Sequence, residues 1–328
     1  MKWYIADYNG VLTDLKAKVN NHLATPRDAD VWVVWQDCAR SFGDLIKTIR
    51  VLGYNKPIYC VQHGGDSTRD YGEPNKYPFL SDKYLCWGKS DFDRLTGLGY
   101  GDKAKIVGCP LNRHIRTKVQ HPEKLVLFIP INSGKEEPEN IAAYYELLRL
   151  KYNKAKTVIL DNKVGLKSTW GFDGKLTVPF KDVGKDFDVI AKLLPGHDKA
   201  LYHGNTVSGY QDGYQNNRLL FNLLANVDLV VGLDEGTTEL FAYAHDVPVV
   251  VCDGFRYAQG QAPYVTKAAL HTSLEDLEDA VEYCLQNPTY KQQERKEIAE
   301  LELGLSYGNA TENIFKLVRE DAKAFSSL

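Results

Sequence analysis

Short apolar runs alternate with amphipathic helical stretches along almost the whole chain, in two successive series. The apolar runs of the first series cover residues 2–8, 31–36, 57–62, 83–87 and 105–107. The helical patterns between them cover residues 12–22, 41–52 and 91–98. Runs that are apolar on both faces are typical of parallel strands covered by helices. The first series therefore predicts a doubly wound α/β domain.

The second series begins near residue 125, after a polar segment around residues 112–123 that we expect to be a linker. Its strands are predicted at residues 125–131, 157–160, 200–202, 227–231 and 248–252. Its helices are predicted at residues 138–152, 217–225, 237–245 and 274–285, with a last helix at 310–324. The two series predict an α/β protein of two Rossmann-like domains, residues 1–115 and 124–305, facing a central cleft. Ligands of such folds bind beyond the carboxyl ends of the strands, so the loops that follow strands should carry the chemistry.

Composition excludes several classes of protein. The chain has 328 residues, of which 44% are hydrophobic and 25% charged, and its net charge is −3. These values fit a globular protein, not a disordered chain or a strongly basic nucleic-acid binder. The six cysteines form no C-x-x-C pair, so we expect buried thiols and no zinc ribbon. The sequence shows neither a signal peptide nor a membrane span, and we expect a cytoplasmic protein.

The first candidate site follows the apolar run at residues 57–62 and consists of His63, two glycines and Asp66. A histidine at the end of a parallel strand is accessible to a substrate, and its pKa near neutrality suits a general base acting on a hydroxyl. Asp66 could orient His63 or bind the acceptor. The alternative is a turn histidine, with glycines that serve the backbone geometry.

The second candidate site follows the predicted strand at residues 227–231. Gly236 would let a ligand approach the backbone, while the N–H groups and hydroxyls of Thr237 and Thr238 could hold a phosphate at a helix N-terminus. Glu239 comes next in the sequence. The alternative is a threonine N-cap that follows a glycine turn.

A third loop, Ser133-Gly134-Lys135, follows the strand predicted at residues 125–131. Lys135 could reach a diphosphate as a point charge. Taken alone, it could equally be a surface lysine.

The order and spacing of these segments resemble the GT-B glycosyltransferases. They are most similar to the group that builds bacterial surface polysaccharides and teichoic acid, and to the related UDP-N-acetylglucosamine 2-epimerases. The resemblance covers roughly residues 55–255 and is carried by Val61-Gln62-His63-Gly64, Val107-Gly108-Cys109-Pro110, residues 227–231, Gly236-Thr237-Thr238 and Val247-Pro248-Val249-Val250.

The resemblance implies a nucleotide-sugar donor held by the C-terminal domain and an acceptor held by the N-terminal one. It also implies metal-independent chemistry, with no cofactor besides the nucleotide sugar as co-substrate, and a final helix, within residues 306–328, that returns to the first domain. The chain departs from the pattern at one position. Many relatives carry a ribose-binding glutamate seven residues before the proline that matches Pro248, and that position is Phe241 here. Glu239 lies two residues earlier, on another face of the predicted helix, so the pattern does not assign it this role. Asp234 and Glu235, in the preceding turn, are the alternatives.

The leading hypothesis is a glycosyltransferase that moves a sugar from a nucleotide-sugar donor to an acceptor hydroxyl, with His63 as base. The acceptor stays open between a saccharide, a lipid-linked glycan and a modified nucleic acid. A nucleotide-sugar 2-epimerase, a non-catalytic binding module and a viral-type transferase that glycosylates modified DNA bases are the alternatives. The cations of the N-terminal segments alternate with aspartates, which favours a solvated mixed-charge surface over a DNA-binding one. They are Lys16, Lys18, Arg27, Arg40, Lys47 and Arg50.

Overall fold

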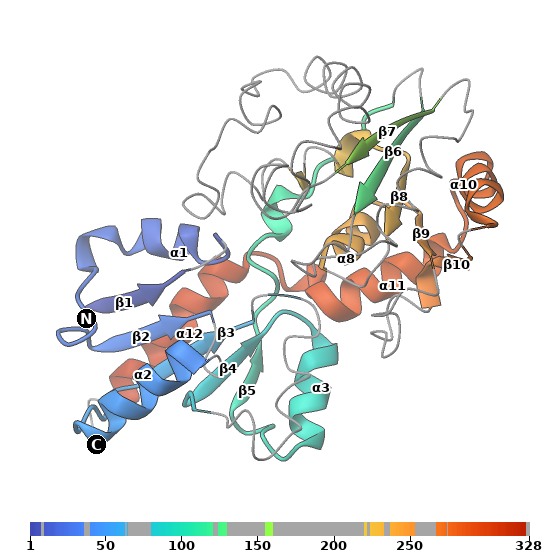
Figure 1. Ribbon diagram of the computed structural model, residues 1–328. Helices are drawn as coiled ribbons and strands as arrows, with labels where there is room; N and C mark the ends of the chain where they lie inside the picture. Colours follow the sequence, from blue (N-terminus) through green and yellow to red (C-terminus); the bar gives the residue numbers. More distant parts are fainter. Residues whose placement is uncertain are drawn as a thin grey trace, which may run out of the picture. The chain divides into compact units, whose positions relative to one another are not determined.

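The chain divides into two compact α/β units, each with one parallel sheet (Figure 1). The computed structural model describes residues 1–7, 10–35, 40–62, 64, 80–120, 124–129, 155–159, 220–221, 224–232, 237–252, 267–273 and 275–325. Unit 1 comprises residues 1–114, 213–217 and 299–328, and unit 2 comprises residues 115–212 and 218–298. The predicted class, α/β with two Rossmann-like domains, is confirmed.

The sheet of unit 1 has five parallel strands in the order in which they occur along the chain. They are β1 (Trp3–Ala6), β2 (Val31–Val34), β3 (Ile58–Val61), β4 (Lys83–Cys86) and β5 (Ala104–Ile106). Every residue of β2 and β3 is buried, as expected for strands covered on both faces. All five strands occur where the apolar runs predict them.

Alternate residues of these strands face different helices. Trp32 and Ile58 belong to a core against which residues of α2 (Arg40–Val51) and α3 (Lys89–Gly97) pack. Tyr59 points the other way, because its hydroxyl donates a 3.2 Å hydrogen bond to Asp321 of α12 (Ala310–Phe325). Because side chains alternate along a strand, α12 covers the face opposite α2 and α3. It also packs against α1 (Thr13–Lys18), which is followed by a short 3-10 turn, Asn20–His22.

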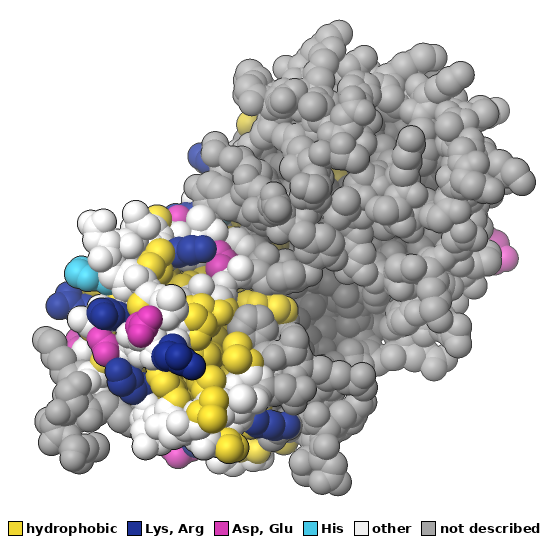
Figure 2. Space-filling model, turned by 60° about the vertical axis from the view of Figure 1, so that its left-hand side comes forward, with side chains coloured by type: hydrophobic (Ala, Val, Ile, Leu, Met, Phe, Trp, Pro, Cys, Tyr) yellow, Lys and Arg dark blue, Asp and Glu magenta, His cyan; other side chains and the backbone are white. Residues whose placement is uncertain are grey.

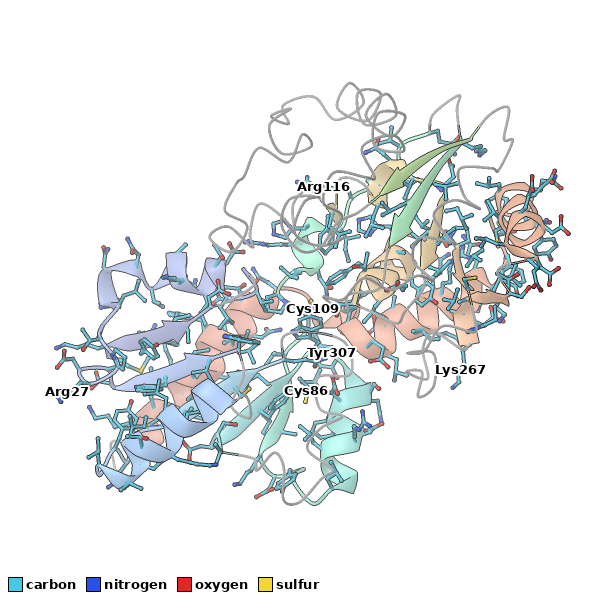
Figure 3. All side chains as sticks on the ribbon, viewed as in Figure 1. Arg27, Cys86, Cys109, Arg116, Lys267 and Tyr307 are labelled. Carbon is cyan, nitrogen blue, oxygen red and sulfur yellow. The ribbon has the colours of Figure 1, made fainter. Side chains whose placement is uncertain are left out.

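The segment before α12 lies against the loops that follow β4 and β5. It contains the end of α11 (Gln292–Leu303) and the 3-10 turn Leu305–Tyr307. The backbone N–H of Cys109 donates to the carbonyl of Leu303, and a Cβ placed on Gly108 would lie 3.3 Å from the Cβ of Tyr307 (Figure 3). Gly88 is closer still, since its Cβ would lie 2.1 Å from the carbonyl oxygen of Leu301. The C-terminal segment therefore leaves no room for a side chain at position 88.

The sheet of unit 2 also has five parallel strands, but their spatial order differs from the chain order. The strands are β6 (Lys124–Ile129), β7 (Ala155–Ile159), β8 (Leu229–Gly232), β9 (Val249–Cys252) and β10 (Leu270–Thr272). Their order is β10-β9-β8-β6-β7. The chain passes from β6 to β7 on one side, and then continues from β8 outwards on the other side of β6. The strand order thus reverses between β6 and β8.

The described helices of unit 2 include α8 (Thr237–Ala244), α10 (Leu277–Gln286) and the first part of α11. Residues 220–221 and 224–226 are also helical, where the sequence predicts a helix at 217–225. The sequence predicted α8 and α10 but neither α11 nor the short strand β10. The helix expected at residues 138–152 and the strand expected at 200–202 lie outside the described residues.

Five cysteines are buried thiols, as the apolar context of the sequence predicts: Cys60, Cys86, Cys109, Cys252 and Cys284. Cys38 lies outside the described residues. Burial raises the pKa of the Cys86 and Cys109 thiols, and it raises that of Cys284 to about 11. These thiols therefore stay protonated and unreactive near neutral pH.

Charges of both signs share the described part of the face of unit 1 that Figure 2 shows. Lys18 pairs with Glu312 at 2.9 Å, Lys56 pairs with Asp30 at 3.0 Å, and Arg113 pairs with Asp14. This arrangement fits the mixed-charge surface that the sequence predicts. Within the described ranges, no helix combines the length and the apolar character that crossing a membrane requires.

Candidate functional site

The reversal of strand order in unit 2 marks the place where a ligand is expected. In open parallel sheets, ligands bind beyond the carboxyl ends of the two strands between which the order reverses. Those strands are β6 and β8, and their last residues, Ile129 and Gly232, are register partners. The segments that contain Ser133-Gly134-Lys135 and Gly236 therefore leave the sheet from adjacent positions. The described strands of unit 1 show no such reversal.

Helix α8 begins with the threonines that the sequence singles out. Thr237 is half-buried, Thr238 is 8% exposed and Glu239 is 1% exposed. The first N–H groups of a helix have no partner inside the helix, and the helix dipole favours negative charge there. The start of α8 can therefore hold an anion. Glu239 lies in the same turn, and the oxygens of its side chain accept hydrogen bonds, so it suits a hydroxyl donor better than a phosphate.

Phe241 occupies the position at which the resemblance leads us to expect a ribose-binding glutamate. Its side chain is 3% exposed, and its ring lies 4.7 Å from the ring of Phe221. A carboxylate at this position would enter an apolar contact without a counter-charge. The position is therefore part of the core of unit 2, and Glu239 is the buried carboxylate that α8 provides.

His245 fixes the far end of α8. Its Nε2 accepts a 3.2 Å hydrogen bond from the backbone N–H of Arg116, and its Nδ1 lies 2.8 Å from the carbonyl oxygen of Phe241. The ring is therefore neutral, with the proton on Nδ1. Burial lowers the pKa of His245, which favours the same neutral form.

The turn after α8 is held by a buried arginine. Arg295 is 0% exposed, and its Nη2 donates to Asp246 Oδ1 at 2.8 Å and to the carbonyl of Pro288 at 3.0 Å. Its Nη1 donates to the carbonyl of Tyr290. Asp246 has a φ of 58°, in the left-handed region. Arg295 thus ties the turn between α8 and β9 to α11.

A second candidate site follows β3 in unit 1. Gln62 is fully buried, and its side chain bonds to two backbone groups: Nε2 donates to the carbonyl of Gly64 at 2.9 Å, and Oε1 accepts from the N–H of Trp87 at 2.6 Å. His63 and Asp66 lie outside the described residues.

The structure thus describes three of the predicted site residues, Thr237, Thr238 and Glu239, and brings them together in the first turn of α8. Ser133, Gly134, Lys135 and Gly236 lie outside the described residues, as do His63 and Asp66, so their roles stay predictions. Sequence reasoning missed Gln62 and the Arg295–Asp246 pair. A polar residue that ends an otherwise apolar strand was the available signal for Gln62.

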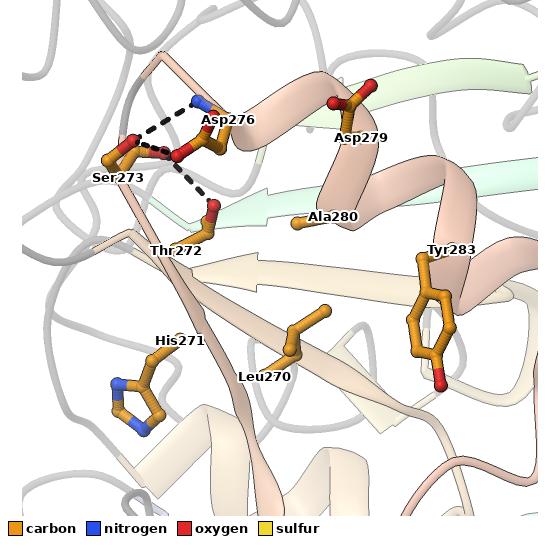
Figure 4. Close-up of a pocket in the computed structure, with 8 residues that line it drawn as sticks. All are labelled: Leu270, His271, Thr272, Ser273, Asp276, Asp279, Ala280 and Tyr283. Carbon is orange, nitrogen blue, oxygen red and sulfur yellow. Dashed lines mark hydrogen bonds between the residues drawn. The ribbon is translucent and has the colours of Figure 1, made fainter.

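A pocket of about 810 Å³ lies between β10 and α10 (Figure 4). Leu270 and Ala280 provide apolar surface, and Asp276 and Asp279 contribute carboxylates. Ser273 and Asp276 also bond to each other, at 2.9 Å. The described residues of its lining include neither lysine nor arginine, so this part of the pocket does not suit a diphosphate.

No group of three or more histidine, cysteine, aspartate or glutamate side chains that could hold a metal ion occurs among the described residues. The expected metal-independent chemistry stays a prediction.

Comparison with known proteins gives a structural likeness without a sequence match. No protein-family profile and no curated protein matches the chain. A UDP-GlcNAc 2-epimerase from Neisseria meningitidis bound to UDP-GlcNAc has a TM-score of 0.54 at 13% identity, covering 94% of this chain and 80% of its own. MnaA from S. aureus with UDP has a TM-score of 0.52 at 14% identity, covering 95% and 78%. A putative UDP-N-acetylglucosamine 2-epimerase from Listeria monocytogenes has a TM-score of 0.51 at 13% identity, covering 96% and 79%.

At identities this low, the likeness establishes the fold alone. The two parallel sheets, the extent of the structural match and the resemblance in motif order agree. The chain has the fold of the GT-B superfamily.

Proposed function

We propose that this chain is an enzyme that uses a nucleotide sugar and transfers the sugar to an acceptor hydroxyl. The observation that carries the proposal is the reversal of strand order between β6 and β8, with α8 beginning shortly after β8. A nucleotide diphosphate is an anion, and a helix N-terminus at such a reversal is suited to bind one.

In this proposal the donor diphosphate lies at the start of α8. The N–H groups of Gly236, Thr237 and Thr238 and the two threonine hydroxyls donate to it. Lys135, with Ser133 and Gly134, approaches it from the end of β6. These donors stabilise the negative charge that grows on the diphosphate as the sugar leaves. Glu239 accepts from a donor hydroxyl.

The loop after β3 supplies the base in this proposal. His63 removes the proton of the acceptor hydroxyl as that oxygen attacks the anomeric carbon, and Asp66 orients His63. Two of the structural neighbours hold UDP-GlcNAc or UDP, which makes a UDP-sugar the first donor to test.

A nucleotide-sugar 2-epimerase is the second candidate. It is favoured by the neighbours themselves, since those with TM-scores above one half include three that carry an epimerase name and one solved with UDP. An epimerase also needs acid and base groups beside the sugar, but it needs no acceptor.

One experiment separates these functions. The full chain is incubated with UDP-GlcNAc alone and then with saccharide acceptors, and the products are followed by proton NMR. Release of UDP that depends on an acceptor supports the transferase, and formation of an epimer without acceptor supports the epimerase. Binding without turnover under either condition indicates a binding module. If calorimetry detects no binding of UDP, UDP-GlcNAc or other nucleotides, the proposal is wrong.

A further inference from the structure

The side-chain amide of Gln62 lies at a position that is completely shielded from solvent. This residue follows β3 directly and is 0% exposed. A buried amide destabilises a protein unless its oxygen and nitrogen both find hydrogen-bond partners. Both partners of the Gln62 side chain are backbone groups of loops at the carboxyl edge of the unit 1 sheet, the carbonyl of Gly64 and the N–H of Trp87.

These two bonds join neighbouring loops. Strands β3 and β4 are paired in parallel, and Trp87 is the first residue after β4. The backbone N–H of Gln62 also donates to the carbonyl of Leu85 at 3.0 Å. The chain is therefore fixed at Gln62 and again at Gly64, two residues later. The residues on both sides of position 63 are held against β4.

The loop after β4 is itself rigidly placed. Trp87 is 0% exposed. A Cβ on Gly88 would lie 2.1 Å from the carbonyl oxygen of Leu301, so the backbone there is in close contact with the end of α11. Gln62 thus connects the turn at residues 62–64 to a firmly packed part of unit 1.

We propose that Gln62 is a positioning residue for His63. Its amide holds the turn in the geometry in which the imidazole meets the acceptor hydroxyl. This inference rests on the proposed function, because it takes His63 as the base. A displacement of about 1 Å at a reacting group can cost about 10²-fold in rate, so the loss of both hydrogen bonds should be visible in kcat.

The test compares three variants of the full chain. Gln62→Met keeps the volume but loses both bonds. Gln62→Glu keeps both bonds only while the carboxyl is protonated, since the carboxylate has no proton to donate to the carbonyl of Gly64. Asn313→Leu is the control. Its side-chain amide also donates to two carbonyls of unit 1, those of Val107 at 3.0 Å and Tyr307 at 2.8 Å, but it does not contact the turn at residues 62–64.

We expect Gln62→Met to lower kcat for UDP-GlcNAc turnover by about 10- to 100-fold, with the Kd for UDP unchanged. Asn313→Leu should stay within about twofold of the parent in kcat, because the carbonyls that it binds, those of Val107 and Tyr307, lie outside the segment 62–64. Burial and the Gly64 carbonyl raise the pKa of a carboxyl at position 62. Gln62→Glu should therefore show a bell-shaped pH–rate profile, whereas the parent rate rises with pH as His63 loses its proton.

The outcomes separate this inference from the proposed function. Equal kcat in Gln62→Met and Asn313→Leu overturns the inference, and so does a Gln62→Glu profile identical to the parent. Parental turnover in His63→Ala overturns the proposed base instead. If no turnover is found, amide hydrogen exchange decides: Gln62→Met must speed exchange in the peptides that contain residues 61–66 and Trp87. Unchanged exchange there also overturns the inference.

Discussion

Removal of the Arg295 guanidinium should destabilise unit 2. In Arg295→Met the aliphatic stem is largely retained, while the hydrogen bonds to Asp246 and to the carbonyls of Pro288 and Tyr290 are lost. A hydrogen bond that involves a charged group is worth about 1.5–3 kcal/mol. Solvent reaches Asp246, whose side chain is 37% exposed, and compensates part of the loss. We therefore expect the free energy of unfolding to fall by about 3 kcal/mol.

Asp246→Asn is the matched control for this prediction. Asparagine retains an oxygen that can accept from Arg295 and tolerates the left-handed φ of 58° at this position. It removes the charge of a partly exposed group and replaces Oδ2, which accepts from Gln292 Nε2, with an NH2 group, so we expect a loss of about 1 kcal/mol.

Urea unfolding measures both variants. With an unchanged m-value, the shift of the midpoint gives the change in free energy, and hydrogen exchange in peptides from α8 and β9 identifies the unit affected. A change below about 0.5 kcal/mol in Arg295→Met, the usual range for a surface substitution, would refute the structural role of the guanidinium.

Four further predictions concern the two units. Burial lowers the pKa of His245 in the folded protein. As pH falls, the unfolded chain therefore binds a proton at this histidine before the folded chain does. The stability of unit 2 should fall as pH drops below about 6.5, by at most about 1.4 kcal/mol per pH unit. Urea midpoints of the parent and His245→Gln between about pH 5 and 8 check this, and equal slopes would contradict it. Gly236→Val should weaken UDP binding in calorimetry by about tenfold or more without lowering the melting temperature, because a β-branched side chain blocks the approach to the backbone; unchanged affinity would remove Gly236 from the site. His63→Ala should lower kcat by about 10²–10⁴ and leave the Kd for UDP intact, whereas parental turnover would reject His63 as the base. Gly88→Ala should lower the melting temperature markedly, since its Cβ would meet the Leu301 carbonyl at 2.1 Å; a parental melting curve would show that this contact yields easily.

Sequence reasoning located the strands because parallel strands buried on both faces leave continuous apolar runs. Nine of the ten strands in the described part of the chain overlap the predicted runs. Strand β10 has only three residues, all half-buried, and therefore lacks this signal. Helix α11 was missed because eight of its 12 residues are charged or carry amides. Its buried residues include Arg295 as well as Ile298, Ala299 and Leu303, and the polar character of an arginine gives no hint of burial in the sequence.

The candidate site could be predicted only in part, because some of its features depend on contacts between residues that are far apart in the sequence. Gly236 and the threonines at the start of α8 are local signals, and they fit an anion site or a threonine N-cap whatever the topology. The reversal of strand order depends on contacts between distant parts of the chain. The sequence of β8 does not predict on which side of β6 this strand pairs. Gln62 is similar, since its role depends on Trp87, which is 25 residues away.

The described strand ends of unit 1 restrict where a base can lie. The end of β1 provides Asp7, but both its oxygens already accept at the start of α1, from the N–H of Leu12 at 3.2 Å and the hydroxyl of Thr13 at 2.9 Å. The ends of β4 and β5 are in contact with the C-terminal segment, through Gly88 and Cys109. The Asp7 carboxylate is occupied by hydrogen bonds at the start of α1 and is poorly placed to receive a proton from a substrate. The loops after β4 and β5 pack against the C-terminal segment and are poorly placed for the same role. The end of β3 differs. There the amide of Gln62 bonds to the backbone of Gly64 and Trp87, and these contacts involve no titratable side chain. The residues after β2, 36–39, lie outside the described part of the chain. Of the other four strand ends, these contacts favour the one after β3, and the assignment of His63 as the base stays a proposal.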